Sequence, residues 1–212
     1  MRVLIACEFS GVVRDAFIAQ GHDAVSCDIL DTESPGPHIK GDVSDVLGDG
    51  WDLMIAHPPC TYLCSMGLWW LNKRPERRLL TEAALRFVET LLSAPIPRIA
   101  LENPVGLIGT RIRKSVQPWM FGDAATKRTC LWLSGLQPLT PTRIVDQGEF
   151  YLRKSGRDRG ARMLKWSHIT SGTRKSDRAR IASQTFPGIA HAMADQWSDP
   201  DLWSNANGST SE

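Results

Sequence analysis

Short apolar segments alternate with segments of helical periodicity through the first hundred residues, and this alternation constrains the fold more than any other feature. Helices are expected at residues 13–19 and at about 75–93, where apolar residues recur with helical spacing. The strands are expected at residues 3–6, 23–27, 38–41, 51–56 and 98–101. Repeated strand-helix units favour an α/β fold with a mostly parallel sheet that is covered by helices on both faces.

The alternation stops after Gly135, where prolines and charges interrupt any apolar period. Since 212 residues suit one main domain with an insertion, we expect four parts. They are a core at 1–137, an insertion at 138–176, a C-terminal helix that completes the core within 177–203, and a disordered polar tail at 204–212. The helical pattern within the third part covers residues 178–197.

The first seven residues suggest a buried strand and not a signal peptide, because Glu8 and Arg14 interrupt the apolar run. No segment approaches the roughly 20 apolar residues that a membrane-spanning helix needs. Five cysteines form no even disulfide framework, so we expect free thiols in a reducing compartment. These features predict a cytoplasmic protein without a membrane partner.

Positive charge gathers in one stretch, although the net charge is only +2. Between Arg153 and Arg180 the basic residues greatly outnumber the acidic ones, and Tyr151 and Trp166 lie among them. Such a stretch suits phosphate neutralisation and base stacking, while the alternative is a solvated basic loop. The residues that we expect to contact nucleic acid are Arg153, Lys154, Arg157, Arg159, Arg162 and Lys165.

Polar and reactive side chains follow the predicted strands. Cys60 comes after Pro58-Pro59 at the end of one strand, and Glu102 follows the next. In open α/β sheets ligands bind beyond the carboxyl ends of the strands, so these side chains should meet in one cleft. The plainer alternative for Cys60 is a structural cysteine in a tight turn.

A thiol and a carboxyl group in one pocket suit a particular reaction. Carbon 5 of cytosine is a poor nucleophile until a thiolate adds to C6, which breaks the aromaticity and produces an enamine. The addition is easier when N3 is protonated or strongly hydrogen-bonded by a carboxyl group. Cys60 and Glu102 supply both groups.

The chain resembles the DNA cytosine-C5 methyltransferases, in a short form of the kind found in phage and prophage genomes. Pro59-Cys60 is similar to the catalytic Pro-Cys of that family, and Glu102-Asn103 to its Glu-Asn-Val element. Residues 126–129 resemble its cationic strand, so that Lys127 or Arg128 faces the substrate. The resemblance implies a Rossmann-like methyltransferase fold, double-stranded DNA as the partner, no metal, and action in the cytoplasm of a bacterial or phage-infected cell.

The resemblance also implies S-adenosylmethionine as the cofactor. Phe9-Ser10-Gly11 is similar to the start of the cofactor loop of the family, Asp28 to its ribose-binding acid, and Asp42 to its adenine-binding acid. Singly, Gly11 could serve a turn, Asp28 a helix cap and Asp42 an Asx turn. The implied cofactor-binding residues are Phe9, Ser10, Gly11, Asp28, Ile29, Asp42, Val43, Pro58 and Gln184.

Other functions remain as alternatives. One alternative is a zinc-dependent deaminase, which has a Pro-Cys-x-x-Cys motif. The spacing between Cys60 and Cys64 is one residue longer than in that motif, and no His-x-Glu precedes it. The segment from His57 to Cys60 is close to the Asp-Pro-Pro-Tyr turn of amino-methyltransferases, although His and Cys are poor replacements there. Modification of a free cytosine nucleotide, or a catalytically silent DNA-binding protein of the same fold, are further readings.

Overall fold

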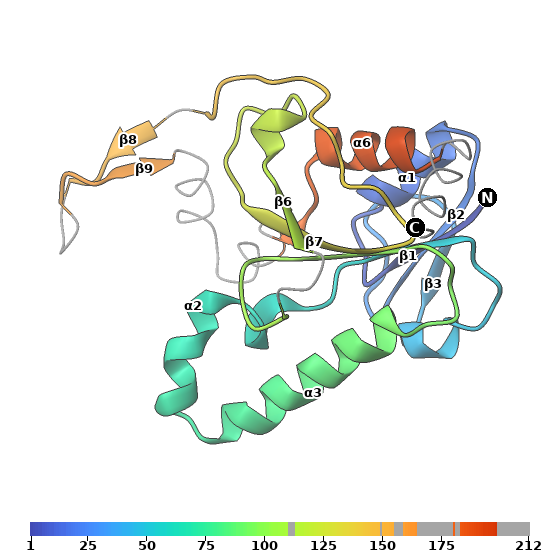
Figure 1. The fold of residues 1–212 in the computed structure, drawn as a ribbon, viewed down its shortest axis with the longest axis horizontal. Helices are drawn as coiled ribbons and strands as arrows, with labels where there is room; N and C mark the ends of the chain where they lie inside the picture. Colours follow the sequence, from blue (N-terminus) through green and yellow to red (C-terminus); the bar gives the residue numbers. More distant parts are fainter. Residues whose placement is uncertain (110–112, 149, 155–158, 165–179, 181–182, 199–212) are drawn as a thin grey trace, which may run out of the picture.

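The computed structural model describes residues 1–109, 113–148, 150–154, 159–164, 180 and 183–198. A seven-stranded sheet crosses the molecule in the order β3-β2-β1-β4-β5-β7-β6 (Figure 1). Its first five strands are parallel, and β7 lies antiparallel to both β5 and β6. The strands are β1 (Arg2–Ala6), β2 (Asp23–Asp28), β3 (His38–Lys40), β4 (Leu53–Ala56), β5 (Ile99–Asn103), β6 (Arg113–Val116) and β7 (Thr129–Ser134).

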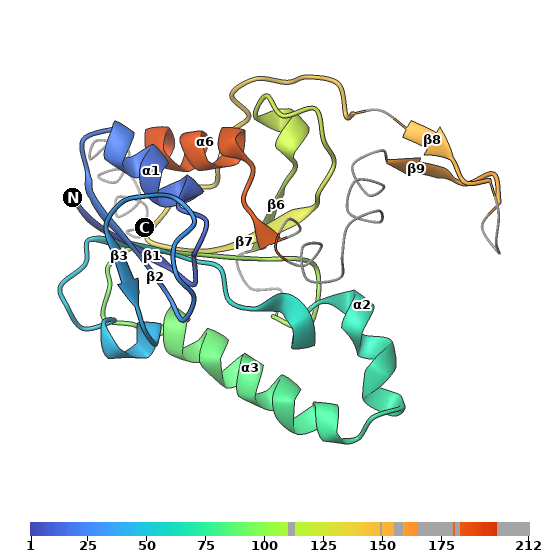
Figure 2. The same cartoon turned by 180° about the vertical axis from the view of Figure 1, so that it is seen from behind.

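Helices cover both faces of this sheet. Helices α1 (Val12–Ala19) and α6 (Pro187–Trp197) lie on one face, and α3 (Glu76–Leu92) lies on the other (Figure 2). All four residues of β4 are buried, as a strand covered on both sides requires. The expected α/β architecture with a mostly parallel sheet is therefore confirmed, and β7, between β5 and the edge strand β6, is its antiparallel strand.

Short elements complete the connections between strands and helices. The helix α2 (Ser65–Leu68) follows the loop after β4. The 3-10 turns are η1 (Val43–Asp45), η2 (Cys60–Tyr62), η3 (Trp69–Asn72) and η4 (Pro118–Met120). None of the helices in the described part of the chain is both long and apolar enough to cross a bilayer.

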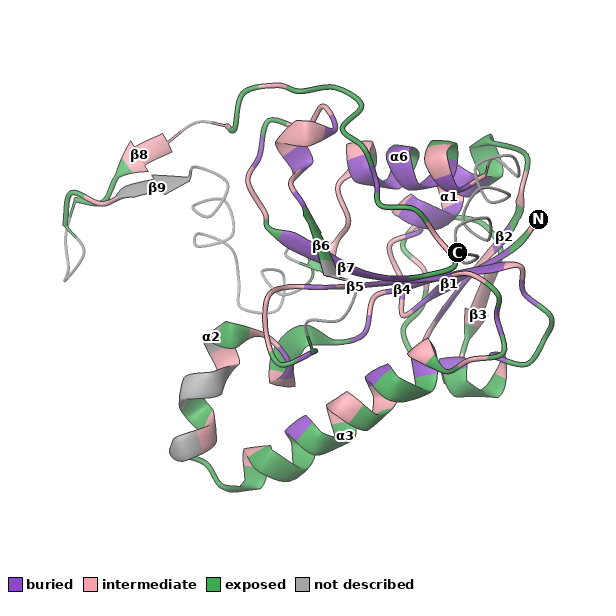
Figure 3. Cartoon of the chain, in the orientation of Figure 1, coloured by how far each residue is buried: buried purple, intermediate pink, exposed green. Residues whose placement is uncertain are grey.

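Helix α3 is exposed in its first turn, and its buried residues are Thr81, Val88 and Leu91. Val88 and Leu91 are buried against the sheet, whereas Leu79 is 70% exposed and Leu80 is 44% exposed. Figure 3 shows the same change along the helix, from green at its start to purple and pink near its end. The apolar stripe in the sequence therefore does not all face the body, and α2, η3 and the start of α3 form an outer arm (residues 65–80).

The C-terminal helix is shorter than the apolar pattern of residues 178–197 indicates. Helix α6 begins at Pro187, so the proline lies in its first turn. Phe186, the residue before it, has extended backbone angles. A residue that precedes proline is pushed away from helical angles, while proline itself suits the first helical position. The helix packs on α1, where Gln20 donates to Asp195 across 175 residues of sequence.

The expected insertion contains an antiparallel hairpin of β8 (Phe150–Leu152) and β9 (Arg162–Leu164). It projects from the body in Figure 1. Arg153, Lys154 and Arg159 are exposed next to its strands. Arg162 lies in β9, whereas Arg157, Lys165 and the tail at 204–212 lie outside the described residues.

Candidate active site

A cavity opens at the carboxyl ends of the three central strands β1, β4 and β5, where ligands bind in folds of this kind. Its volume is about 590 Å³, including the solvent-filled space at its open mouth. Strand ends, the start of β7 and the segment before α6 all contribute to its wall. The lining residues are Cys7, Glu8, Phe9, Ser10, His57, Pro58, Pro59, Cys60, Glu102, Pro104, Lys127, Ser183, Gln184 and Thr185.

Cys60 begins the turn η2 directly after the two prolines. The backbone N–H groups of Leu63 and Cys64 both donate to the Cys60 carbonyl, which closes this turn. The residue is exposed, yet the walls around the sulfur remove enough water to raise its pKa. The charge of Glu102 raises that pKa further, against a smaller lowering by Lys127. Cys60 is therefore protonated, as a thiol, at neutral pH.

Asn103 and Gly106 hold the Cys60 loop in place. The buried Asn103 side chain donates through Nδ2 to the Pro58 carbonyl, at 2.8 Å. The backbone of Leu107 donates to the Leu63 carbonyl, and a Cβ on Gly106 would lie only 1.8 Å from that oxygen. Glycine is thus required where the two loops approach each other most closely.

Glu102 lies within β5 and not after it. Its partner in the neighbouring strand is Leu131, and its side chain is 13% exposed. Its Oε2 lies 3.5 Å from Nδ1 of His57. Burial raises the pKa of Glu102, but the nearby His57, together with the charge of Lys127, lowers it more. Glu102 is therefore a carboxylate at neutral pH.

Lys127 and Arg128 point to different places. Lys127 lines the cavity, where its Nζ donates to the Gln184 carbonyl at 3.0 Å. Burial lowers the pKa of Lys127, while Glu102 and Cys60 raise it again. Arg128 is exposed, donates to Ser115 Oγ at 3.1 Å and is not part of the lining. Lys127 is the cation that faces the cavity.

The first βα turn forms the opposite wall. Phe9 and Ser10 line the cavity, as expected, but Gly11 does not. Gly11 has a φ of +78°, and a Cβ there would lie 2.6 Å from the Arg14 guanidinium. The Glu8 carboxylate accepts the backbone N–H groups of Val13 and Arg14, so it caps α1. Gly11 thus serves the turn and the close approach of Arg14.

Arg14 is fully buried and ties α1 to the loop after β2. Its guanidinium donates to Ser26 and Thr32 side chains and to the carbonyls of Ser34 and Pro35. Because a buried charge needs such partners, this arginine fixes the loop beside the cavity.

Of the other expected cofactor residues, Pro58 and Gln184 line the cavity, whereas Asp28, Ile29, Asp42 and Val43 do not. Asp28 accepts the Leu30 N–H at 2.9 Å, and Asp42 accepts the Ser44 N–H at 2.9 Å, which lowers the pKa of Asp42. The Asx turn considered for Asp42 is thus present, at the start of η1, whereas Asp28 stabilises a turn and does not cap a helix. Ile29 is 73% exposed, whereas Val43 belongs to the core. Burial, with smaller contributions from Asp28, Cys27 and Asp42, raises the pKa of Cys7 in the cavity wall to about 12.

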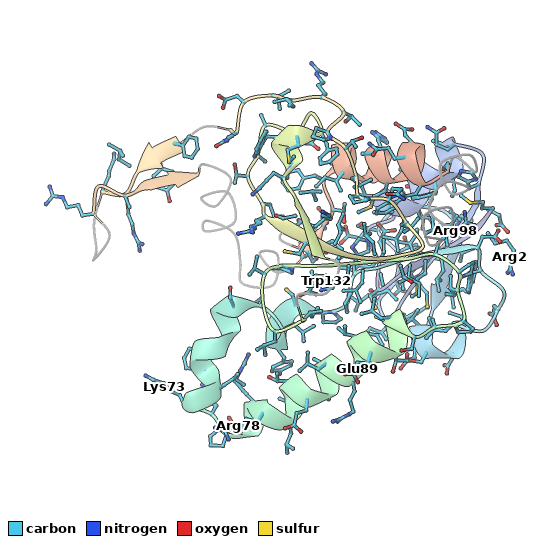
Figure 4. The ribbon with its side chains drawn as sticks, in the orientation of Figure 1. Arg2, Lys73, Arg78, Glu89, Arg98 and Trp132 are labelled. Carbon is cyan, nitrogen blue, oxygen red and sulfur yellow. The ribbon has the colours of Figure 1, made fainter. Side chains whose placement is uncertain are left out.

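Sequence reasoning missed several residues of this site. His57 was considered only as a poor replacement for the aspartate in the Asp-Pro-Pro-Tyr turn of amino-methyltransferases. Its position directly after a predicted strand, which is also the reason for selecting Cys60, could have identified it. The basic residues of the outer arm were missed because they lie just before and at the start of a helical pattern, where charged residues are ordinary. Arg77 donates to the Thr61 carbonyl and lies over the Tyr62 ring, next to the Cys60 turn. Figure 4 shows Lys73 and Arg78 at the far end of this arm.

Comparison with known proteins adds no name to this site. No protein-family model matches the chain, and no curated protein is significantly similar to it. Within the described residues, no group of three or more His, Cys, Asp or Glu side chains is placed to hold a metal ion. The function of this site is therefore inferred from the residues that line the cavity.

Proposed function

We propose that the protein transfers a methyl group from S-adenosylmethionine to C5 of cytosine in DNA, through a covalent bond between Cys60 and C6. One observation carries the proposal: Cys60, Glu102 and Lys127 come from three separate segments and line the same cavity. A thiol, a carboxylate and a cation in one pocket are the groups that this reaction requires.

Each of these side chains has a task in the reaction. Cys60 loses its proton to water at the cavity mouth, and its sulfur adds to C6 of the pyrimidine. Glu102 faces N3 and the exocyclic amine of the ring. Lys127 offsets the negative charge of Glu102 and favours the thiolate, since it lowers the pKa of Cys60. After transfer the C5 proton leaves to water and the bond between sulfur and C6 breaks.

The residues around the first three strand ends fit S-adenosylmethionine. Asp28 and Asp42 offer carboxylates for ribose and adenine at the ends of β2 and β3. Ile29, exposed beside Asp28, offers an apolar surface for the adenine ring. Phe9, Ser10, Pro58 and Gln184 would hold the methionine part, and the cofactor supplies an electrophilic methyl group at C5.

Two basic regions support DNA as the substrate. The hairpin carries the exposed Arg153, Lys154 and Arg159, and the outer arm carries the exposed Lys73 and Arg78. Cations at such places contact phosphates and position a duplex without reading its sequence. The target cytosine would then be flipped out of the duplex to reach Cys60, at a cost of a few kcal/mol.

Covalent trapping tests the proposal. Duplex DNA that contains 5-fluorocytosine should form a denaturant-resistant adduct with the protein when S-adenosylmethionine is present, because fluorine cannot leave as the C5 proton does. The Cys60→Ser variant should form none, since a hydroxyl is a far weaker nucleophile.

Controls make this experiment specific. Cys64→Ser, which changes the neighbouring thiol, should still form the adduct. Trapping of 5-fluoro-dCMP as efficiently as duplex DNA would favour a free nucleotide as the substrate. DNA binding without any adduct in the wild-type protein would contradict the proposal and favour a silent DNA-binding protein.

A further inference from the structure

His57 is a buried histidine in the cavity wall. Its backbone N–H donates to the Ala6 carbonyl at 2.9 Å, which fixes the residue between the ends of β1 and β4. Its side chain is only 9% exposed, and its Nδ1 lies 3.5 Å from Oε2 of Glu102. The two side chains come from neighbouring strand ends, β4 and β5, so their pairing is set by the sheet.

The ring nitrogens of His57 lack ordinary hydrogen bonds. Among the described residues neither Nδ1 nor Nε2 has a partner with hydrogen-bond geometry, and Glu102 at 3.5 Å is an ion-pair contact. Leaving a buried polar group without a hydrogen bond is unfavourable, and a catalytic task is one explanation for such a group in a native structure. An imidazole that lines a cavity in this state is available to a proton or a ligand.

The proposed reaction needs a proton at this place. Glu102 faces N3 of the cytosine ring but is a carboxylate, because His57 and Lys127 hold its pKa down. Lys127 already donates to the Gln184 carbonyl, and Cys60 must itself lose a proton. Of the titratable groups that line the cavity, namely Cys7, Glu8, His57, Cys60, Glu102 and Lys127, His57 is best placed to supply the proton, because its Nδ1 lies 3.5 Å from the Glu102 carboxylate.

We propose that His57 is a positioning residue for Glu102: it holds the carboxyl group against the cavity and supplies the proton that Glu102 passes to N3. This inference rests on the proposed function. As the cytosine ring enters, Glu102 takes the proton from Nδ1 of His57 and donates it to N3.

The bonds balance in this sequence. The Cys60 sulfur forms a bond to C6, the electron pair of the C5–C6 double bond moves between C4 and C5, and the pair of the C4–N3 double bond takes the proton. After methyl transfer the C5 proton leaves to water, and the bond between sulfur and C6 breaks. N3 returns its proton to Glu102, and Glu102 returns it to His57.

The pH dependence of single-turnover methylation tests the inference. The thiolate of Cys60 forms as pH rises, so the rate should increase with pH on one side of the profile. The proton held by the His57–Glu102 pair is present at low pH and lost as pH rises, so the rate should decrease on the other side. His57→Asn keeps a polar side chain but cannot carry the proton.

The variant should lose about 10²–10⁴-fold in rate, the usual contribution of a positioned acid-base group. The high-pH decrease should disappear, while the dissociation constants for DNA and cofactor stay unchanged. His191→Asn, on the exposed side of α6, should behave as the wild type. A high-pH decrease that persists in His57→Asn, or a loss confined to binding, would overturn the inference.

A second measurement needs no methylation. In protein labelled with carbon-13 at glutamate carboxyl groups, the Glu102 signal is the one that Glu102→Gln removes. The pKa of Glu102 should be higher in His57→Asn and in His57→Gln, because the cation that lowers it is gone. An unchanged Glu102 titration in both folded variants would refute the pairing. A wild-type protein without methylation but with this shift would refute the proposed function alone.

Discussion

The hydrogen bond from Asn103 to the Pro58 carbonyl joins the strand that carries Glu102 to the loop that carries Cys60. Asn103 is 1% exposed, and Nδ2 lies 2.8 Å from the Pro58 oxygen. Asn103→Ala removes the donor and leaves a buried carbonyl without its partner. We expect this change to weaken both the fold and the geometry of the site.

The magnitude follows from the burial of both groups. A buried acceptor that loses its donor costs about 1–3 kcal/mol, and in a protein of this size each kcal/mol lowers the melting temperature by about 2–4 °C. Displacement of a reacting group by about 1 Å can cost about 10²-fold in rate. We therefore expect a lower melting temperature in calorimetry and a lower single-turnover methylation rate, measured well below the melting temperature, with unchanged cofactor affinity.

Two further variants sharpen this experiment. Asn103→Asp has the same shape but places a carboxylate oxygen against the Pro58 carbonyl, so it should lose more stability than Asn103→Ala. Glu89→Ala, on the exposed side of α3, should change stability by less than about 0.5 kcal/mol and leave the rate intact. Wild-type stability and rate in Asn103→Ala would refute the argument that this bond positions Cys60.

The remaining predictions concern the thiol and the outer arm. Glu102→Gln removes a charge that raises the pKa of Cys60, so iodoacetamide should label Cys60 faster near neutral pH, as peptide mass spectrometry can measure, while methylation slows. An unchanged labelling rate, with Glu89→Gln as the control, would show that Glu102 does not act on the thiol. For the arm, Lys73→Ala and Arg78→Ala should each reduce the slope of log affinity against log salt for duplex DNA by roughly 0.9 if the residue contacts a phosphate. A slope equal to that of the wild type would exclude the arm from the DNA interface.

The amino-acid sequence predicted the parallel half of the fold because apolar runs there end at marked turns. The run before Pro58 gave β4 to within two residues, and the order of strand ends brought Cys60 and Glu102 to one cavity. The end of β5 was placed too early, because an apolar pattern stops at Leu101 while the strand continues through Glu102 to Asn103.

Other features have no signal in local periodicity. Strand β6, Arg-Lys-Ser-Val, is polar at the sheet edge, so its sequence resembles a loop. Burial of Arg14 depends on carbonyls that a distant loop brings to it. The exposure of Leu79 is likewise set by where α3 leaves the sheet, and not by its spacing in the helix.

The packing of α6 on α1 has a consequence for how the chain folds during synthesis. Phe17 of α1 shares its core with Met193 and Trp197 of α6, and Gln20 meets Asp195 across 175 residues. At about 5–20 residues per second, the ribosome would take roughly 10–35 s after it has made α1 to reach the end of α6. During that interval the apolar side of the first βα unit has no cover from α6. The wall segment at residues 183–185 is also made late, so a nascent chain has a complete cavity only after this segment has been translated.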